Sequence, residues 1–256
     1  MKSTNPIVKP ESASKSSKAA ATPRWPMLGS DQRAPGEVAH SRAYEVLKEA
    51  VLAGQFRPGE VVTLRSLAKE LAVSEMPVRE ALRRLTAEGA FEALPNRSAR
   101  VPILTRLQVE QILSLRQQLE GQAAAHAARN ITLVQIEHLR ALQNGIEQCI
   151  SKSDARTHTS LNMAFHFEIY RIADNQVLTS VIQMLWLRMA PLVGSIVELL
   201  ASKPGTFKRV ALEHHERMLR AFQSRDAAAA EAAMRDDLLA TTKITGYWES
   251  LQLRTR

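Results

Sequence analysis

Four polar side chains in the second half of the chain could together bind a cation or an anion. They are Asn162, His166, His215 and Asp237, and each falls on an apolar helical stripe, where a polar group is costly without a partner. Asn162 and His166 are four residues apart and therefore share a helix face. One buried histidine is usually only a hydrogen-bonded core residue. Two imidazoles, a carboxylate and an amide on converging stripes instead indicate a metal or anion pocket.

Arg116 is a fifth polar residue on such a stripe. Its apolar neighbours on that face are Val109, Ile112, Leu113, Leu119 and Ala123. Because a charge that faces a core needs a partner, one interpretation is an ion pair with Glu120 or with a neighbouring helix. The other interpretation is an anion-binding residue in a ligand cavity. The sequence leaves both open.

A helical scaffold is expected to position these residues, because glycine is scarce after Ile103 and no segment alternates with period two. The predicted helices are 105–128, 132–151, 154–174, 176–202, 206–224 and 227–247. In this frame His215 and Asp237 point inward. The most apolar part, Met184–Leu200, contains Arg188, Pro191 and Glu198, so a core helix is favoured over a membrane span.

Residues 64–85 show two short amphipathic helical patterns, separated by Val73-Ser74. The spacing of the apolar residues gives each helix one buried face. Ser74 is expected to cap the second helix with its hydroxyl, and Pro77 fits the first turn, where a missing N–H costs nothing. An arginine-bearing helix after a short turn is typical of a recognition helix in the DNA major groove. The exposed face of this helix carries Glu75, Arg79 and Arg83.

A small hairpin, or wing, is predicted to follow. Gly89 is a candidate C-cap, and residues 91–94 and 100–103 can pair across the turn-rich tip at 95–98. Arg97 and Arg100 would place positive charge at the tip and the base of the wing. Before the two helices, a helical pattern from Tyr44 to Leu52 ends at Gly54, and a turn at Pro58-Gly59 follows.

Composition and charge agree with a folded DNA-binding protein of two domains. The chain has 256 residues, 45% of them hydrophobic and 23% charged, and a net charge of +8. Residues 1–104 hold 16 Lys and Arg against 11 Asp and Glu, so most of the basic excess lies in the half that would read DNA. Cys149 is the single cysteine, which excludes an intrachain disulfide and fits a reducing cytoplasm.

We therefore expect a mainly α protein, with an N-terminal winged helix-turn-helix followed by an all-α helical-bundle effector domain. Residues 1–38 mix Ser, Lys, Ala and Pro without periodicity or a signal-type apolar run, and we interpret them as a disordered arm. The DNA-binding domain is predicted at 39–104, the helical domain at 105–248 and a tail at 249–256.

The segment Tyr44–Val101 resembles the winged helix-turn-helix domain of the GntR family of bacterial transcription regulators. The resemblance implies DNA contacts at Arg65, Ser74, Glu75, Met76, Arg79 and the wing tip. The matching residues are Leu47, Gly54, Pro58-Gly59, Leu67-Ala68, Leu71, Val73-Ser74, Pro77-Val78-Arg79-Glu80-Ala81-Leu82, Leu85, Gly89 and Arg100-Val101.

Two departures from the family pattern fall on positions that read DNA. Family members usually carry Arg-Thr at Glu75-Met76, and glycines at the wing positions Asn96 and Ser98. A glutamate cannot hold a phosphate, although it can accept a hydrogen bond from a cytosine amine. An operator different from the common family sequence is therefore expected.

The C-terminal half, Leu107–Leu239, resembles the effector-binding domain of the FadR-type (FCD) branch of the same family. The resemblance rests on Leu115-Arg116, Leu119-Glu120, Phe165-His166, Ala173-Asp174-Asn175 and the block from His215 through Ala221-Phe222 to Asp226. In metal-binding members of that branch, an Asp and a His four residues apart join two later histidines around a divalent ion. The corresponding residues here are Asn162, His166, His215 and Asp237, so one Asp is replaced by Asn and one His by Asp.

The resemblance implies a homodimer that reads a palindromic operator and senses a small carboxylate, such as an organic or sugar acid. Two modes of sensing remain open: a zinc-like ion on the four residues above, or a metal-free pocket in which Arg116, Asn162, His166 and His215 hold the acid directly. Binding would shift operator affinity by linkage, with repression relieved by ligand as the commoner mode.

Two other functions remain as alternatives. One is a DNA-binding regulator with a degenerate, ligand-free helical domain, which the changes at Asn162 and Asp237 support. The other is a metal-dependent hydrolase that uses His214-His215-Glu216 with Asp237. The hydrolase is disfavoured because the chain has no HExxH pair, no glycine-rich phosphate loop and no nucleophile elbow.

Overall fold

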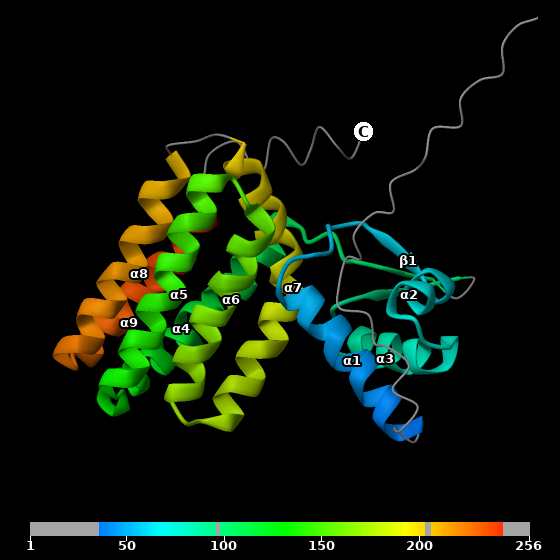
Figure 1. Cartoon of the computed structure of the whole chain (residues 1–256), viewed down its shortest axis with the longest axis horizontal. Coiled ribbons are helices and arrows are strands. Elements are labelled where there is room, and N and C mark those ends of the chain that lie inside the picture. The colour runs from blue at the N-terminus through cyan, green and yellow to red at the C-terminus, as the bar shows by residue number, and fades with distance from the viewer. Residues whose placement is uncertain (1–35, 96–97, 203–205, 243–256) are drawn as a thin grey trace, which may run out of the picture.

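The structure is a computed structural model that describes residues 36–95, 98–202 and 206–242. A small N-terminal region, which contains the helix-turn-helix predicted to bind DNA and is therefore called the DNA-reading region, lies beside a larger bundle of helices (Figure 1). The first region contains α1 (Gly36–Leu52), β1 (Val61–Thr63), α2 (Leu64–Leu71), α3 (Glu75–Ala87), β2 (Glu92–Leu94) and β3 (Ser98–Arg100). The bundle contains α4 (Arg106–Asn130), α5 (Leu133–Lys152), α6 (Ala155–Ile172), α7 (Gln176–Ala201), α8 (Thr206–Ser224) and α9 (Ala227–Thr242).

The six helices predicted for the C-terminal half are confirmed to within a few residues. Local signals explain their starts: Thr105 and Thr132 form capping boxes with Gln108 and Gln135, and Asn175 caps α7. The last helix was predicted to reach residue 247, and residues beyond 242 lie outside the described ranges. At the other end, α1 begins at Gly36, so the last three residues assigned to the arm are helical.

The helix-turn-helix is confirmed, but the capping role of the Ser74 hydroxyl was wrong. Ser74 occupies the N-cap position of α3 with extended backbone, and its side chain makes no capping hydrogen bond. Pro77, three residues later, has no N–H, so one of the two backbone donors that such a hydroxyl can accept is missing. The Ser74 hydroxyl is exposed and stays available for another partner.

The wing is a three-stranded sheet in the order β1-β3-β2, and the limits predicted for its final strand were wrong. The final strand was expected at 100–103 but runs from Ser98 to Arg100, so Ser98 pairs with Leu94 instead of lying in the turn. Strand β1 was not predicted, because three residues are too short to show an alternating pattern. Residues 96 and 97, which include two predicted DNA contacts, lie outside the described ranges.

Helix α7 packs against other helices of the bundle and also against α1. Its 26 residues are apolar enough, by length and composition, to cross a membrane, but more than half of its most apolar window is buried within the protein. One side of its C-terminal half packs with Val109 and Ile112 of α4 in a separate apolar cluster. Pro191 lies inside the helix and cannot donate the backbone hydrogen bond to the preceding turn, which locally weakens α7.

Helix α7 also contacts the DNA-reading region, where α1 packs against it (Figure 1). Gly54 follows α1 with a positive φ of 64°, and its backbone lies against Ala190 and Gly194 of α7. A Cβ atom at Gly194 would overlap the Gly54 carbonyl oxygen. Arg57 adds an exposed ion pair of 3.0 Å to Glu198 on the same helix. The two regions therefore touch through a close backbone contact that requires glycine at both positions.

Candidate metal and effector site

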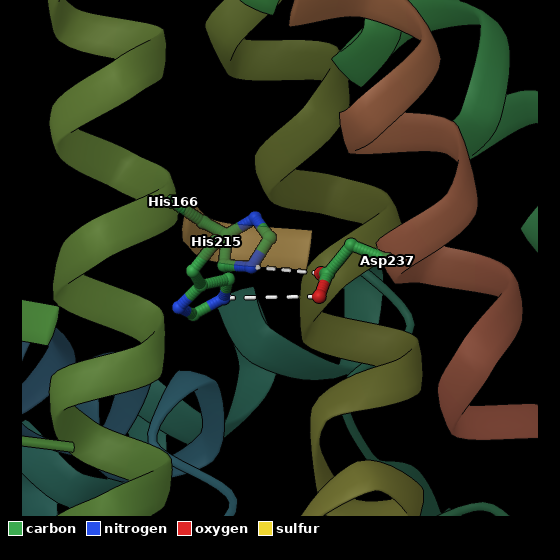
Figure 2. Close-up of side chains that lie close together, drawn as sticks. All are labelled: His166, His215 and Asp237. Carbon is green, nitrogen blue, oxygen red and sulfur yellow. Dashed lines mark ion pairs between the residues drawn. The ribbon is translucent and has the colours of Figure 1, made fainter. Parts of the chain in front are cut away.

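Three side chains from three helices meet inside the bundle: His166 of α6, His215 of α8 and Asp237 of α9 (Figure 2). The Nε2 atom of His166 is 3.3 Å from Oδ2 of Asp237, and Nε2 of His215 is 3.8 Å from Oδ1. Both imidazoles are buried, and the carboxylate is largely buried. The inward orientation predicted for these three residues is confirmed.

A glutamine on α5 orients the ring of His215. Gln143 donates from Nε2 to the backbone carbonyl of Leu212 at 3.3 Å, which leaves its Oε1 atom facing His215 Nδ1 at 2.7 Å. Phe165 stacks on the same imidazole at 4.2 Å with nearly parallel planes. Burial lowers the pKa of His215 to about 3, although the charge of Asp237 acts in the opposite direction, so the imidazole is neutral at physiological pH.

His166 lies at the end of a buried chain of hydrogen bonds. Its Nδ1 atom is 3.3 Å from the hydroxyl of Tyr170, and that hydroxyl donates to Glu120 at 2.5 Å. Glu120 in turn accepts from Arg116 at 2.5 Å. Burial, assisted by the charge of Glu120, raises the pKa of Tyr170 well above its ordinary value, so the phenol keeps its proton.

The ion pair with Glu120 confirms one of the two interpretations of Arg116. Burial alone would lower the pKa of this guanidinium, but the charge and hydrogen bond of Glu120 outweigh it and raise the value. The guanidinium also lies 4.5 Å from the centre of the Trp186 ring. Arg116 lines the same cavity as His166, yet its charge already has a partner.

The cavity beside the cluster is small, about 30 Å³. It is lined by Leu113, Arg116, Asn162, His166, Trp186, Met189, Val193, Ile196, Asp237 and Leu238. A water molecule needs roughly 10–15 Å³ of such space, so the cavity can hold an ion with one or two waters. A sugar acid needs side chains or a helix to move first. Asn162 faces the cavity one helical turn before His166, as its spacing predicted.

The donor set suits a divalent metal ion. The ligand atoms of His166, His215 and Asp237 all lie within 4.8 Å of one another. Ligands bound to zinc at about 2.0–2.2 Å in a tetrahedral site are roughly 3.3 Å apart, so the observed distances need only a small contraction. Burial would raise the pKa of Asp237, but contact with His166 and the other imidazoles outweighs it and keeps the carboxylate ionised. Two neutral imidazoles and one carboxylate are appropriate ligands for zinc or a similar ion.

The predicted DNA-reading residues lie at the N-terminal half of α3 and on α2. Arg65, Ser74, Met76 and Arg79 are exposed, and Glu75 is half-buried. Arg83 is exposed as well, but it forms a bidentate contact with Glu80 on its own helix, at 2.6 Å for the shorter bond. Arg100, expected at the base of the wing, pairs across the sheet with Glu92 at 2.7 Å. A DNA phosphate would have to compete with these carboxylates.

Sequence patterns did not identify Gln143 or Tyr170. Tyr170 follows His166 by four residues, so helical spacing could have placed it on the same face. Gln143 lies on the inward face of α5 with Ile136, Leu139 and Ile146, and that position was the available signal.

Comparisons with known proteins agree with this architecture. Residues 39–101 match the sequence profile of the bacterial regulatory proteins of the gntR family, and residues 111–240 match that of the FCD domain. The chain is 31% identical over 180 residues to the HTH-type transcriptional regulator McbR of Escherichia coli K12, covering 70% of this chain and 80% of McbR. It is 27% identical over 219 residues to the gluconate operon transcriptional repressor of Bacillus subtilis 168, covering 82% of this chain and 86% of that protein. Among solved structures, E. coli McbR/YncC superposes with a TM-score of 0.74 at 25% identity, over 83% of this chain and 98% of the other.

Proposed function

The chain belongs to the GntR family of bacterial transcription regulators with an FCD effector domain, and from that premise we propose a metal-assisted sensor of a small carboxylate. In this proposal residues 105–248 bind the ligand and pair two chains, while residues 39–104 of each chain read half of a palindromic operator. Ligand binding weakens operator binding and relieves repression.

The observation that supports the proposal most strongly is the convergence of His166, His215 and Asp237. Two of these residues, His166 and Asp237, line the same cavity. The three residues would hold the cation, with Asn162 near enough to add an amide oxygen. A bound divalent ion supplies a positive centre for a carboxylate oxygen. Arg116 is already neutralised by Glu120, so the cluster offers a better partner for an anion than the guanidinium does.

Helix α7 provides the physical link between the ligand and DNA. Trp186, Met189 and Val193 line the cavity, while Ala190 and Gly194 of the same helix touch the backbone of Gly54. A metabolite larger than the cavity has to displace this wall, and the weakened turn at Pro191 makes α7 the element that yields most easily. Displacement of α7 moves the DNA-reading region. The ligand-bound and ligand-free states then differ in their fit to the operator, as linkage requires.

DNA reading is assigned to Arg65, Ser74, Glu75, Met76 and Arg79, together with Asn96, Arg97 and Ser98 of the wing. Arg83 is a secondary contact, because Glu80 already engages it. The exposed hydroxyl of Ser74, which caps no helix, suits a phosphate oxygen.

The test begins by selecting genomic fragments that the full chain binds, which supplies an operator. Operator affinity is then measured by gel shift with zinc alone, with each of a panel of organic and sugar acids, and with both. The proposal predicts that at least one acid weakens binding at least about fivefold, the lower limit of ordinary allosteric coupling, and that a chelator removes the effect. Equal operator affinity under every condition would contradict ligand sensing.

A regulator with a ligand-free helical domain is the second candidate, and the small size of the cavity favours it. In that case the cluster is only a structural cation site or an ion-paired core. Thermal melting separates the two candidates: a sensor is stabilised by its acid as well as by the metal, whereas the ligand-free domain responds to no acid.

A further inference from the structure

We infer that Gln143 and Tyr170 are positioning residues that hold both histidines in the form that presents an unprotonated Nε2 to Asp237. The inference rests on the proposed metal site and assigns a role to two residues outside its ligand set. Metal-bound histidines commonly donate their other ring N–H to a fixed acceptor, which sets the tautomer and the ring direction. Here the acceptors come from two different helices.

For His215 the direction of the hydrogen bond is fixed by the far end of Gln143. The amide nitrogen of Gln143 donates to the Leu212 carbonyl, so the atom that faces the imidazole is the acceptor Oε1, at 2.7 Å. His215 Nδ1 must therefore carry the proton and donate. A neutral imidazole carries a single ring proton, so with that proton on Nδ1 the Nε2 atom has a free lone pair.

That lone pair faces Oδ1 of Asp237 across 3.8 Å, which is too long for a hydrogen bond. Two electron-rich atoms that face each other in a buried site repel unless a cation lies between them. The separation suits two ligands of one metal ion. The geometry set by Gln143 thus favours a cation at this point.

For His166 the direction is fixed by charges at the end of the hydrogen-bond chain. Glu120 is ion-paired with Arg116, so it is an acceptor and the Tyr170 hydroxyl donates its proton to it. The phenol oxygen is then left to accept from His166 Nδ1 at 3.3 Å. The Nε2 atom of His166 then has a free lone pair directed at Asp237 Oδ2, and a metal ion can bridge the 3.3 Å distance.

The experiment measures zinc affinity and histidine tautomers in the full chain. Gln143→Leu keeps the volume and removes the acceptor, and Tyr170→Phe does the same for His166. Each variant should weaken zinc binding by about 10–100-fold, the usual effect of losing such a partner. Gln143→Glu restores an acceptor and should recover most of the affinity. The matched control is Gln118→Leu, on the exposed face of α4, which should bind zinc as the wild type does.

A second readout does not depend on metal. In the metal-free wild type, nitrogen-15 NMR of labelled histidine should show His215 protonated at Nδ1, and in Gln143→Leu that preference should be lost. His215 protonated at Nε2 in the wild type would overturn the inference, as would unchanged zinc affinity in both Gln143→Leu and Tyr170→Phe. If the wild type binds no zinc, the metal proposal fails, and the tautomer measurement still decides the role of Gln143.

Discussion

The backbone of Gly54 lies against the backbone of Gly194, and this contact joins the DNA-reading region to the helix that lines the cavity beside His166. The sequence positions are 140 residues apart, and neither glycine can be replaced without displacing backbone. A contact of this kind transmits movement well, because backbone atoms cannot adapt by changing rotamer.

Gly194→Ala should damage both stability and coupling. The added Cβ overlaps the Gly54 carbonyl, and overpacking of this kind costs about 1–3 kcal/mol of unfolding free energy. The response of operator affinity to ligand should also decrease, since the two regions no longer meet in the same way. Gly145→Ala is the matched control, because its Cβ meets only the flexible side chain of Leu161. Chemical denaturation and gel shifts measure both quantities, and equal behaviour of the two variants would refute a special role for the junction.

Arg79→Ala should weaken operator binding by about 1–3 kcal/mol while leaving the fold intact. Arg79 is exposed on α3, and within the described residues its side chain makes no hydrogen bond or ion pair. Arg83→Ala should have a smaller effect, because Glu80 already engages that side chain. Arg171→Ala on the bundle, which likewise pairs with a glutamate on its own helix, is the control and should bind DNA normally. A larger loss for Arg83 than for Arg79 would reverse the assignment of the reading face.

Glu75 and Met76 should determine which operator is preferred. The double substitution Glu75→Arg, Met76→Thr introduces the residues usual in the family, so the variant should select a different DNA sequence from a random pool. The physical reason is that arginine binds guanine or phosphate, whereas glutamate can only accept, as from a cytosine amine. Selection of the same sequence by both proteins would show that these positions do not read bases.

Removing Glu120 should strongly destabilise the bundle. Glu120→Ala leaves the buried Arg116 without its carboxylate, and loss of one partner of a buried pair costs about 3–5 kcal/mol. The double substitution Arg116→Met, Glu120→Leu should restore much of the loss, because it removes the unpaired charge. Urea denaturation checks this order. If Glu120→Ala were as stable as the wild type, water would have to solvate the unpaired guanidinium of Arg116, and the pair would not be buried as described.

Much of the architecture could be predicted from local sequence signals. The six helices of the bundle follow from apolar spacing and from caps such as Thr105 and Asn175, which act within a few residues. The wing was less predictable, because β1 and β3 are three residues long and depend on pairing across the sheet. Periodicity carries no signal at that length.

The inward positions of the candidate ligands could be predicted from the sequence, whereas their surroundings could not. Helical phase placed His166, His215 and Asp237 inward, and the structure brings them together. The partnership of Arg116 with Glu120 was one of two open interpretations. The role of Gln143 depends on a carbonyl of α8, 69 residues away, and no sequence pattern encodes such a pairing. The contact of Gly54 with Gly194 is equally a product of tertiary packing.

The central claim is that His166, His215 and Asp237 hold one divalent cation, and zinc stoichiometry tests it most directly. The full chain is loaded with zinc, dialysed and measured by inductively coupled plasma mass spectrometry beside His215→Ala and the exposed control His138→Ala. The account predicts about one zinc per chain in the wild type and the control, and almost none in His215→Ala, because two remaining ligands hold the ion poorly. A wild type that retains no more zinc than His215→Ala would contradict it.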